Sequence, residues 1–287
     1  MFNTGSELIK LCKEQKKKIS QIVIDKEMEN SGLKYEELIE KMKKILVTMK
    51  ESAQYSLDKE VISVSKLTGG NAKKVEDYKN NHKTICGKLL NSAMAMALST
   101  SEVNASMGKI VAAPTAGASG ILPAALFTVK ERLQLSDDDL VLGLFTAAGI
   151  GEIVVKNATV SGAEGGCQAE CGVASAMAAA AVVELAGGSV EASLNAASFS
   201  IINVMGLVCD PVAGLVEFPC SIRNASGVAN ALISADLALA GVKSFVPFDE
   251  VVEAMYKVGK LMPESLKETA QGGVADTKTG REAWKRL

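Results

Sequence analysis

At 287 residues and a formal net charge of −2, the chain can bury a substantial core, and its charge favours neither a nucleic acid nor an anionic membrane as partner. Hydrophobic residues make up 48% and aromatic residues only 4%, a composition that favours closely packed helices. The N-terminus lacks the apolar core of a signal peptide, and no uncharged apolar run reaches the roughly 18 residues that span a bilayer. We therefore expect a soluble cytoplasmic protein whose six cysteines stay reduced.

Residues 1–90 are predicted to form a helical arm. This segment is basic, with 18 Lys and Arg against 13 Asp and Glu, whereas the remainder of the chain has 13 against 20. Apolar residues recur there at helical spacing: Leu8, Leu11, Cys12, Ile19, Ile22, Val23, Leu38, Met42, Ile45, Leu46 and Met49. The basic surface of the arm is either simply solvated or a docking surface for an acidic partner subunit.

Residues 91–270 are predicted to form a compact, mainly α-helical catalytic domain rich in Ala and Gly. Residues 161–240 alone contain 19 alanines, and alternating strand patterns are scarce. Turns are expected at 113–120, 161–166, 187–189, 210–214 and 246–249. Residues 271–287 are expected to form a polar, loosely packed C-terminal tail.

Cys167, Cys209 and Cys220 are the candidate metal ligands. Cys167 follows two glycines and begins a predicted helix, where exposed N–H groups favour the thiolate. Cys209 and Cys220 bound the segment Cys-Asp-Pro-Val-Ala-Gly-Leu-Val-Glu-Phe-Pro-Cys, whose prolines and turn residues hold side chains in fixed directions. Three thiolates from separate turns suit a [4Fe–4S] cluster with one iron free of protein ligands, since electron-transfer clusters usually have four.

The residues alone leave two other interpretations of these cysteines open. They can be buried structural thiols, or they can bind zinc, although no Cys-x-x-Cys pair and no neighbouring His supports zinc. Among the other cysteines, Cys12 lies on an apolar helix face and Cys86 in a polar stretch. Cys171 comes one turn after Cys167, so that a Cys-x-x-x-Cys pair is possible.

The loop Ala113-Pro-Thr-Ala-Gly-Ala-Ser-Gly-Ile-Leu-Pro123 is the second candidate site. Its small residues free backbone N–H groups to bind an anion, and two hydroxyls add to them. We expect Thr115, Gly117 and Ser119 to bind a substrate carboxylate. The alternative is a loop that only breaks a helix. It is not a P-loop, because no Gly-Lys-Ser/Thr follows, and the chain has no dinucleotide fingerprint.

Together these segments resemble the α subunit of the bacterial iron–sulfur-dependent L-serine dehydratases. The resemblance runs from about Ser65 to Gly280 and rests on five stretches: Glu102-Val-Asn-Ala-Ser-Met-Gly108, Ala113–Pro123, Ser161–Cys167, Cys209–Cys220 and Arg223-Asn224. It implies an all-helical catalytic region with a [4Fe–4S] cluster on three cysteines and no pyridoxal phosphate. The implied lyase reaction converts L-serine to pyruvate and ammonia, with the 113–123 loop in the substrate pocket.

The chain departs from the single-chain members of that family in two respects. Some of them end in a cysteine that occupies the cluster, whereas this chain ends Trp284-Lys-Arg-Leu287, so self-blocking is not expected. They also carry an N-terminal β region with a Gly-His motif, which is missing here, so a separate β subunit is expected. A related lyase acting on L-cysteine and a non-catalytic cluster-bearing subunit are the alternative functions.

The general base is not identified by the sequence. Histidine most often removes protons at neutral pH, but the only one, His82, lies in a polar stretch that resembles a surface turn. Lys156 is a weak second candidate, since it would need burial to lower its pKa. A histidine from the partner chain is the preferred interpretation.

Overall fold

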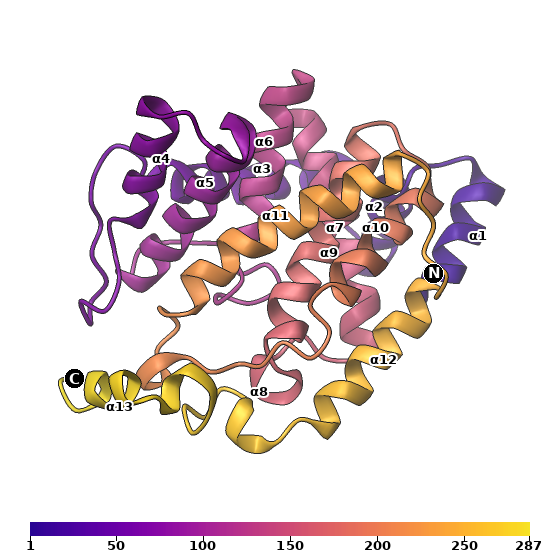
Figure 1. Cartoon of the computed structure of the whole chain (residues 1–287). Coiled ribbons are helices and arrows are strands. Elements are labelled where there is room, and N and C mark those ends of the chain that lie inside the picture. Colours follow the sequence, from indigo (N-terminus) through magenta and orange to yellow (C-terminus); the bar gives the residue numbers. More distant parts are fainter.

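A computed structural model describes all 287 residues, which form thirteen α-helices and no β-strand (Figure 1). The predicted mainly α-helical fold is confirmed. Strand-like pairing is limited to two isolated bridges, between Ile62 and Gly69 and between Cys209 and Lys267. The connections between helices therefore carry the irregular backbone that the turn residues of the sequence predict.

Helix α9 (Val173–Leu185) forms the centre of the molecule, and every residue from Val173 to Glu184 is buried. Its side chains are mostly Ala and Val, so neighbouring helices approach closely. The stretch Gln168–Leu185 is long and apolar enough to cross a bilayer by length and composition alone. Because 89% of that window is buried inside the protein, we interpret it as the core helix. Four helices surround it: α6 (Ile121–Leu133), α7 (Asp137–Asn157), α10 (Val190–Ile202) and α11 (Cys220–Leu239).

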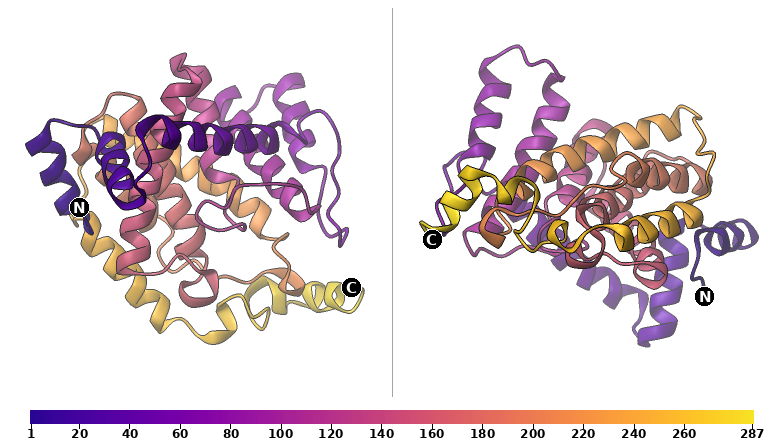
Figure 2. Two further views of the ribbon diagram at one scale, coloured as in Figure 1. Left: turned by 180° about the vertical axis from the view of Figure 1, so that it is seen from behind. Right: turned by 60° about the horizontal axis from the view of Figure 1, so that its bottom comes forward.

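A second layer covers this centre. The first five helices are α1 (Gly5–Gln15), α2 (Ile19–Ser31), α3 (Tyr35–Gln54), α4 (Asn71–Asn81) and α5 (Gly87–Ala105). Helix α2 packs on α7, α3 lies across α5, α6 and α7, and α4 runs beside α5, as the view from behind shows (Figure 2).

The N-terminal helices share one hydrophobic core with the rest of the chain. A continuous cluster of 57 buried residues extends from Phe2 to Met255 and includes Leu8, Ile19 and Leu46. Cys12 belongs to it, as its apolar helix face predicts. The division into an arm over 1–90 and a catalytic domain over 91–270 stays a prediction, although α1 to α3 pack directly into the common core.

The C-terminal segment contains short helical elements, and its description as a loosely packed tail stays a prediction. After α12 (Phe248–Leu261) come the short turns η3 (Glu264–Leu266) and η4 (Gly273–Asp276), then α13 (Lys278–Trp284). The N–H of Val274 donates a 2.6 Å hydrogen bond to Oδ2 of Asp210, and Ala275 is buried. The composition of 271–287 does not reveal this order, because the carboxylate that anchors it comes from a distant part of the chain.

Candidate functional site

Cys167 lies at the start of a π-helical turn, η1 (Gln168–Gly172), between the short helix α8 (Gly162–Gly165) and α9. Turns of this kind are frequent at functional sites. The residue before Cys167, Gly166, has a φ of 76°, which accounts for a glycine at that position. The Sγ of Cys167 is buried and lies 3.3 Å from the Sγ of Cys171.

The electrostatics of the site single out Cys167 among its thiols. The hydrogen bond between Cys167 and Cys171 lowers the pKa of the Cys167 thiol, and the positive charge of Arg223 acts in the same direction. The sequence predicts this preference for thiolate, but it attributes it to the start of a helix. The interaction with Cys167, together with burial, raises the pKa of Cys171 well above its usual value. Of this close pair, the thiol of Cys167 therefore has the lower pKa.

Cys209 and Cys220 lie near Cys167 but belong to a later segment of the chain. Cys209 is held by its backbone: its N–H donates to the oxygen of Leu266 at 2.9 Å, and its oxygen accepts from the N–H of Glu268 at 2.7 Å. Cys220 is the first residue of α11. Burial raises the pKa of Cys209, and burial together with the charge of Cys167 raises that of Cys220 to about 12. The three candidate thiols are thus within electrostatic reach of one another.

Whether these residues fit a metal group depends on which group is considered. No three His, Cys, Asp or Glu side chains surround a single point as the ligands of one metal ion do. The thiolates of an iron–sulfur cluster bind different irons, so their sulfurs need not converge on one point. Three buried or half-buried thiols on separate segments, one with a lowered pKa, are a donor set that fits a cluster.

Asn224 fastens the loop 113–120 to the helix that begins with Cys220. Its Oδ1 accepts a hydrogen bond from the N–H of Gly120 at 2.9 Å, and its Nδ2 donates to the oxygens of Gly117 at 2.6 Å and Cys220 at 2.9 Å. The hydroxyl of Ser119 is used within the loop, where it donates to the oxygen of Ala116. The sequence contains Asn224 in one of its motifs without indicating this role.

Glu170 joins the loop to the cysteine segments. Its Oε1 accepts a 2.8 Å hydrogen bond from the hydroxyl of Thr115, and its Oε2 lies 3.7 Å from the Sγ of Cys209. The side chain is buried, and this burial raises the pKa of the Glu170 carboxyl. Glu170 is not among the site residues predicted from the sequence. A carboxylate three residues after Cys167, in an otherwise apolar and Gly-rich stretch, is the signal that could have found it.

A buried ion pair orients the segment that carries Cys209. Arg223 on α11 contacts the carboxylate of Asp210 at 2.7 Å and donates to the oxygen of Val208 at 2.9 Å. Asp210 is almost fully buried, and its other oxygen accepts the hydrogen bond from Val274. One carboxylate therefore connects the Cys209 segment to α11 and to the C-terminal turn η4.

The chain is similar to known proteins over nearly its whole length. The family model described as serine dehydratase alpha chain matches residues 14–275. This chain belongs to that family. The L-serine dehydratase alpha chain of Peptoniphilus asaccharolyticus is 55% identical over 282 residues, covering 98% of this chain and 97% of that protein. The probable L-serine dehydratase alpha chain of Bacillus subtilis (strain 168) is 49% identical over 287 residues, covering 100% of this chain and 95% of that one.

Longer members of the serine dehydratase family contain a region similar to this chain. The L-serine dehydratase of Helicobacter pylori (strain J99 / ATCC 700824) is 36% identical over 285 residues, which are 96% of this chain but 62% of that protein. The alpha chains are thus matched over nearly their whole length, and the longer protein over part of its length.

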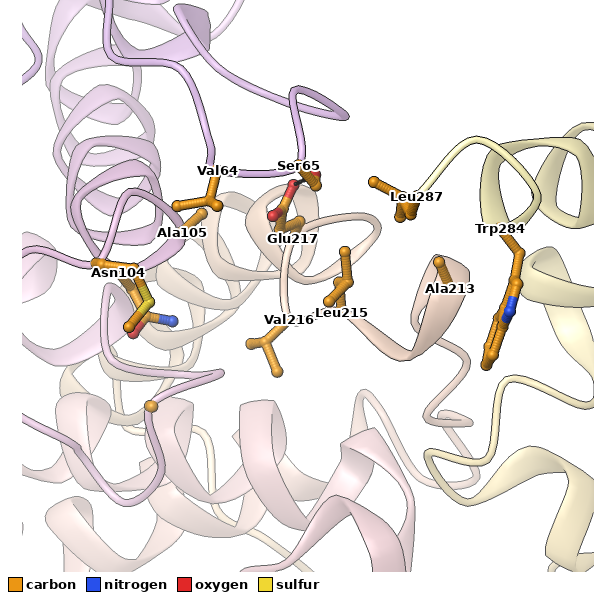
Figure 3. Close-up of a pocket in the computed structure, with 12 residues that line it drawn as sticks. Val64, Ser65, Asn104, Ala105, Ala213, Leu215, Val216, Glu217, Trp284 and Leu287 are labelled. Atoms are coloured by element: carbon orange, nitrogen blue, oxygen red, sulfur yellow. Dashed lines mark hydrogen bonds between the residues drawn. The ribbon is translucent and has the colours of Figure 1, made fainter.

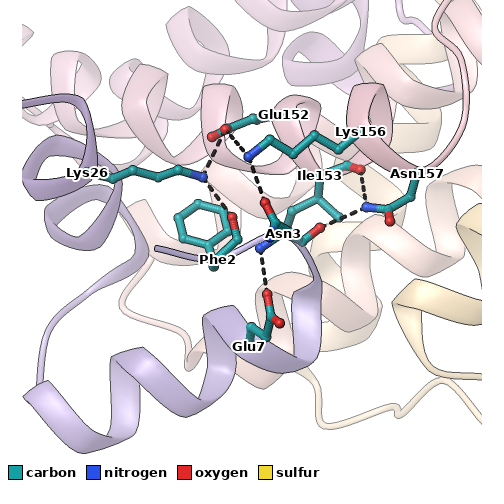
Figure 4. A network of polar contacts seen from close by, with 8 residues as sticks. All are labelled: Phe2, Asn3, Glu7, Lys26, Glu152, Ile153, Lys156 and Asn157. Atoms are coloured by element: carbon teal, nitrogen blue, oxygen red, sulfur yellow. Dashed lines mark hydrogen bonds and ion pairs between the residues drawn. The ribbon is translucent and has the colours of Figure 1, made fainter. Parts of the chain in front are cut away.

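Lys156 and His82, the two candidate bases predicted from the sequence, make their contacts away from the cysteine segments. Lys156 pairs with Glu152 at 2.8 Å and donates to Oδ1 of Asn3 at 2.9 Å (Figure 4). The hydrogen bond to Glu152 raises the pKa of Lys156, which keeps this lysine charged. His82 is exposed at the end of α4, where it stacks on Tyr78 with ring centroids 5.2 Å apart.

An open, mainly apolar cavity of about 790 Å³ adjoins the loop 113–120 (Figure 3). Its lining includes Ala116 of the loop, Leu215 and Val216, and the C-terminal Trp284 and Leu287. None of the cysteines lines it, although Leu215 and Val216 belong to the segment between Cys209 and Cys220. Val216 still connects the two regions, because a Cβ on Gly117 would come within 3.2 Å of its Cγ1.

Proposed function

We propose that this chain is the α subunit of an L-serine dehydratase, a cytoplasmic lyase that removes water from L-serine to give pyruvate and ammonia. The similarity to proteins named L-serine dehydratase alpha chain supports the substrate and the reaction. The observation that carries the proposal is the link between the loop 113–120 and the cysteine segments through Asn224 and Glu170, because one site needs both a place for the substrate and a place for the chemistry.

Cys167, Cys209 and Cys220 are the residues that would hold a [4Fe–4S] cluster. The burial of Cys167 and Cys209, the partial burial of Cys220, the lowered pKa of Cys167 and the origin of the three on separate segments support this assignment. When bound, the cluster supplies an iron without a protein ligand, which acts as a Lewis acid on the serine hydroxyl. No pyridoxal phosphate is part of the proposal.

The loop 113–120 provides groups that suit the carboxylate of an amino acid. The backbone N–H groups of Thr115, Ala116, Gly117 and Ala118 donate no hydrogen bond within the protein. Successive free N–H groups bind anions, so we assign Thr115 and Gly117 to substrate binding. Ser119 supports the loop from within, since its buried hydroxyl bonds to Ala116. A carboxylate held here would orient the rest of the substrate relative to the cysteine segments.

The general base is proposed to come from a separate β subunit. The only histidine of this chain, His82, makes none of its contacts at the site, and Lys156 is ion-paired and charged. The names of the two most similar proteins reported above describe alpha chains, and the longer Helicobacter protein has a further region that this chain does not match. These observations support a hetero-oligomer in which the partner completes the site.

The experiment that tests the proposal begins with the chain purified and reconstituted with iron and sulfide without oxygen. Bound iron, bound sulfide and a broad visible absorption are expected in the chain alone, together with very slow dehydration of L-serine. Addition of the β subunit is expected to raise the rate by the roughly 10²–10⁴ of a positioned general base. His82→Ala and Lys156→Ala should leave that rate nearly unchanged.

Three outcomes would contradict it. Zinc in place of iron would remove the cluster, and faster turnover of L-cysteine than of L-serine would change the substrate. Full activity of this chain alone, lost in the His82 or Lys156 variant, would place the base within it.

A further inference from the structure

We propose that Glu170 is a positioning residue that couples the substrate loop to the Cys209 segment, so that the loop is correctly placed only when Glu170 contacts both. The inference rests on the proposed function for its meaning in catalysis, but the coupling itself belongs to the chain and can be measured without a cluster. Three observations carry it: the two contacts of the carboxyl group, its burial, and the glycines that surround it.

The two oxygens of Glu170 face different segments. Oε1 accepts the hydroxyl hydrogen of Thr115 at 2.8 Å, and Oε2 lies 3.7 Å from the sulfur of Cys209. The residue itself belongs to η1, directly after Cys167. The side chain of Glu170 therefore contacts the loop and the Cys209 segment, while its backbone belongs to the segment that begins at Cys167. A buried carboxyl group is costly to place without partners, so its two contacts restrain each other.

A glycine, and not a larger residue, lies next to each of the two carboxyl oxygens of Glu170. A Cβ on Gly162 would lie 2.5 Å from Oε2 and 2.9 Å from the sulfur of Cys209. A Cβ on Gly117 would lie 3.3 Å from Oε1. Any residue larger than glycine at position 162 would displace Glu170, Cys209 or both. The space for this arrangement is thus reserved by two segments that are far apart in the chain.

The test compares Glu170→Ala with Glu170→Gln. Glutamine keeps the length of the side chain, its carbonyl oxygen can accept from Thr115, and its amide can reach the Cys209 sulfur. In the enzyme with its β subunit and cluster, we expect Glu170→Ala to raise the KM for L-serine roughly ten-fold or more, as loss of a buried hydrogen bond does, and Glu170→Gln to restore most of it. Glu164→Ala, an exposed change in α8, is the matched control and should leave the KM unchanged.

A second measurement uses the iron-free chain, in which the alkylation rate of Cys209 by iodoacetamide is followed by mass spectrometry. We expect Glu170→Ala, Gly162→Ala and Thr115→Val each to increase this rate several-fold over that of the unchanged chain and of Glu164→Ala. Thr115→Val is decisive, because the structure gives Thr115 a hydrogen bond to Glu170 and none to Cys209. The Glu170→Ala and Thr115→Val effects should not add in the double variant, since they act through one hydrogen bond.

The coupling is wrong if Thr115→Val leaves the Cys209 alkylation rate unchanged while Glu170→Ala raises it, because Glu170 would then only pack locally. It is also wrong if Glu170→Ala lowers the thermal stability but leaves the KM for L-serine unchanged. A chain that binds no iron or does not act on L-serine, yet shows the Thr115 effect on Cys209, would contradict the proposed function and leave the coupling intact.

Discussion

Three cysteines and one glutamate make up the candidate site. Cys167, Cys209 and Cys220 come from three segments, and Glu170 lies between the loop and one of them. Cys171 is as close as 3.3 Å to Cys167, but burial and its neighbour oppose its ionisation. The ligand assignment can therefore be tested one cysteine at a time.

Replacing Cys167, Cys209 or Cys220 by Ala should each abolish iron retention after anaerobic reconstitution, because each removes one of three thiolates. Cys171→Ala and the exposed Cys86→Ala should retain iron and serve as controls. Iron and sulfide analysis with visible absorption is the measurement. A Cys171 variant that loses its iron while Cys167→Ala keeps it would reverse the assignment of this pair.

Arg223 and Asp210 provide a prediction about the support of the site. Arg223→Ala leaves the buried Asp210 carboxylate without its cation, and breaking such a pair costs about 3 kcal/mol of unfolding free energy. Urea unfolding of the iron-free chain measures this cost. The control is Arg281→Ala, whose pair with Asp276 is exposed and should contribute about 1 kcal/mol or less. Equal costs would show that the buried pair has no special role.

The cysteines and the loop could be found from the sequence because glycines, prolines and thiols are unusual residue types with local meaning. Glu170 and Asn224 could not be assigned roles in the same way. Their contacts reach Thr115 and Gly117, which lie far from them in the sequence, so only the packed structure brings them together. The prediction of a thiolate at Cys167 rests on the start of a helix, whereas in the structure the hydrogen bond with Cys171 lowers the pKa of Cys167.

At the scale of the helices, buried carboxylates satisfy the free N–H groups at the beginnings of other helices. Glu184 on α9 accepts hydrogen bonds from the N–H groups of Ile19 and Ser20 at the start of α2. Glu102 does the same for Asn71 and Ala72 at the start of α4. Free N–H groups and the helix dipole both favour a negative charge at such positions. These carboxyl groups therefore connect α9 to α2 and α5 to α4.

Glu184→Ala should destabilise the chain by about 3 kcal/mol, since it leaves two buried N–H groups of α2 and the hydroxyl of Thr146 without their acceptor. The change in unfolding free energy is measured by urea denaturation. Glu40→Ala, at an exposed position of α3, should cost well under 1 kcal/mol. A similar cost for both variants would mean that the contacts of Glu184 contribute little.

Helix positions in the first fifty residues follow from the periodicity of apolar residues, which places Leu8, Ile22 and Leu46 on buried faces. The order of the last seventeen residues does not follow from such a pattern, because η4 begins where Asp210 provides an acceptor for Val274. The spacing of apolar residues thus predicts helices that bury one apolar face. It does not predict short elements such as η4, whose position depends on one residue far away in the sequence.

At the scale of the whole molecule, a continuous core joins the basic N-terminal helices to the acidic remainder. The buried cluster includes Phe2 at one end and Met255 at the other. Lys26 shows the connection in detail, since it is buried, pairs with Glu152 at 2.9 Å and donates to the oxygen of Phe2 (Figure 4). The difference in charge between residues 1–90 and the remainder of the chain is therefore not enough to define two separate domains.

The continuous core predicts that the iron-free chain unfolds in one cooperative transition. Residues of α1 to α3 and residues of α9 belong to the same buried cluster, so neither set can lose its packing alone at small cost. Differential scanning calorimetry and far-UV circular dichroism should give coincident curves. Two separate transitions, one of them lost on deletion of residues 1–90, would instead support an independent arm.

The backbone pairing of Cys209 with Leu266 and Glu268 has a consequence for how the protein is made. A ribosome releases Cys167, Cys209 and Cys220 well before Leu266 and Glu268, at about 5–20 residues per second. Until those two residues emerge, the hydrogen bonds that hold the Cys209 backbone have no partners. The backbone around Cys209 therefore reaches its final hydrogen bonding only when nearly the whole chain has been synthesised, so any group that needs Cys209 in this position must bind a finished polypeptide instead of a growing one.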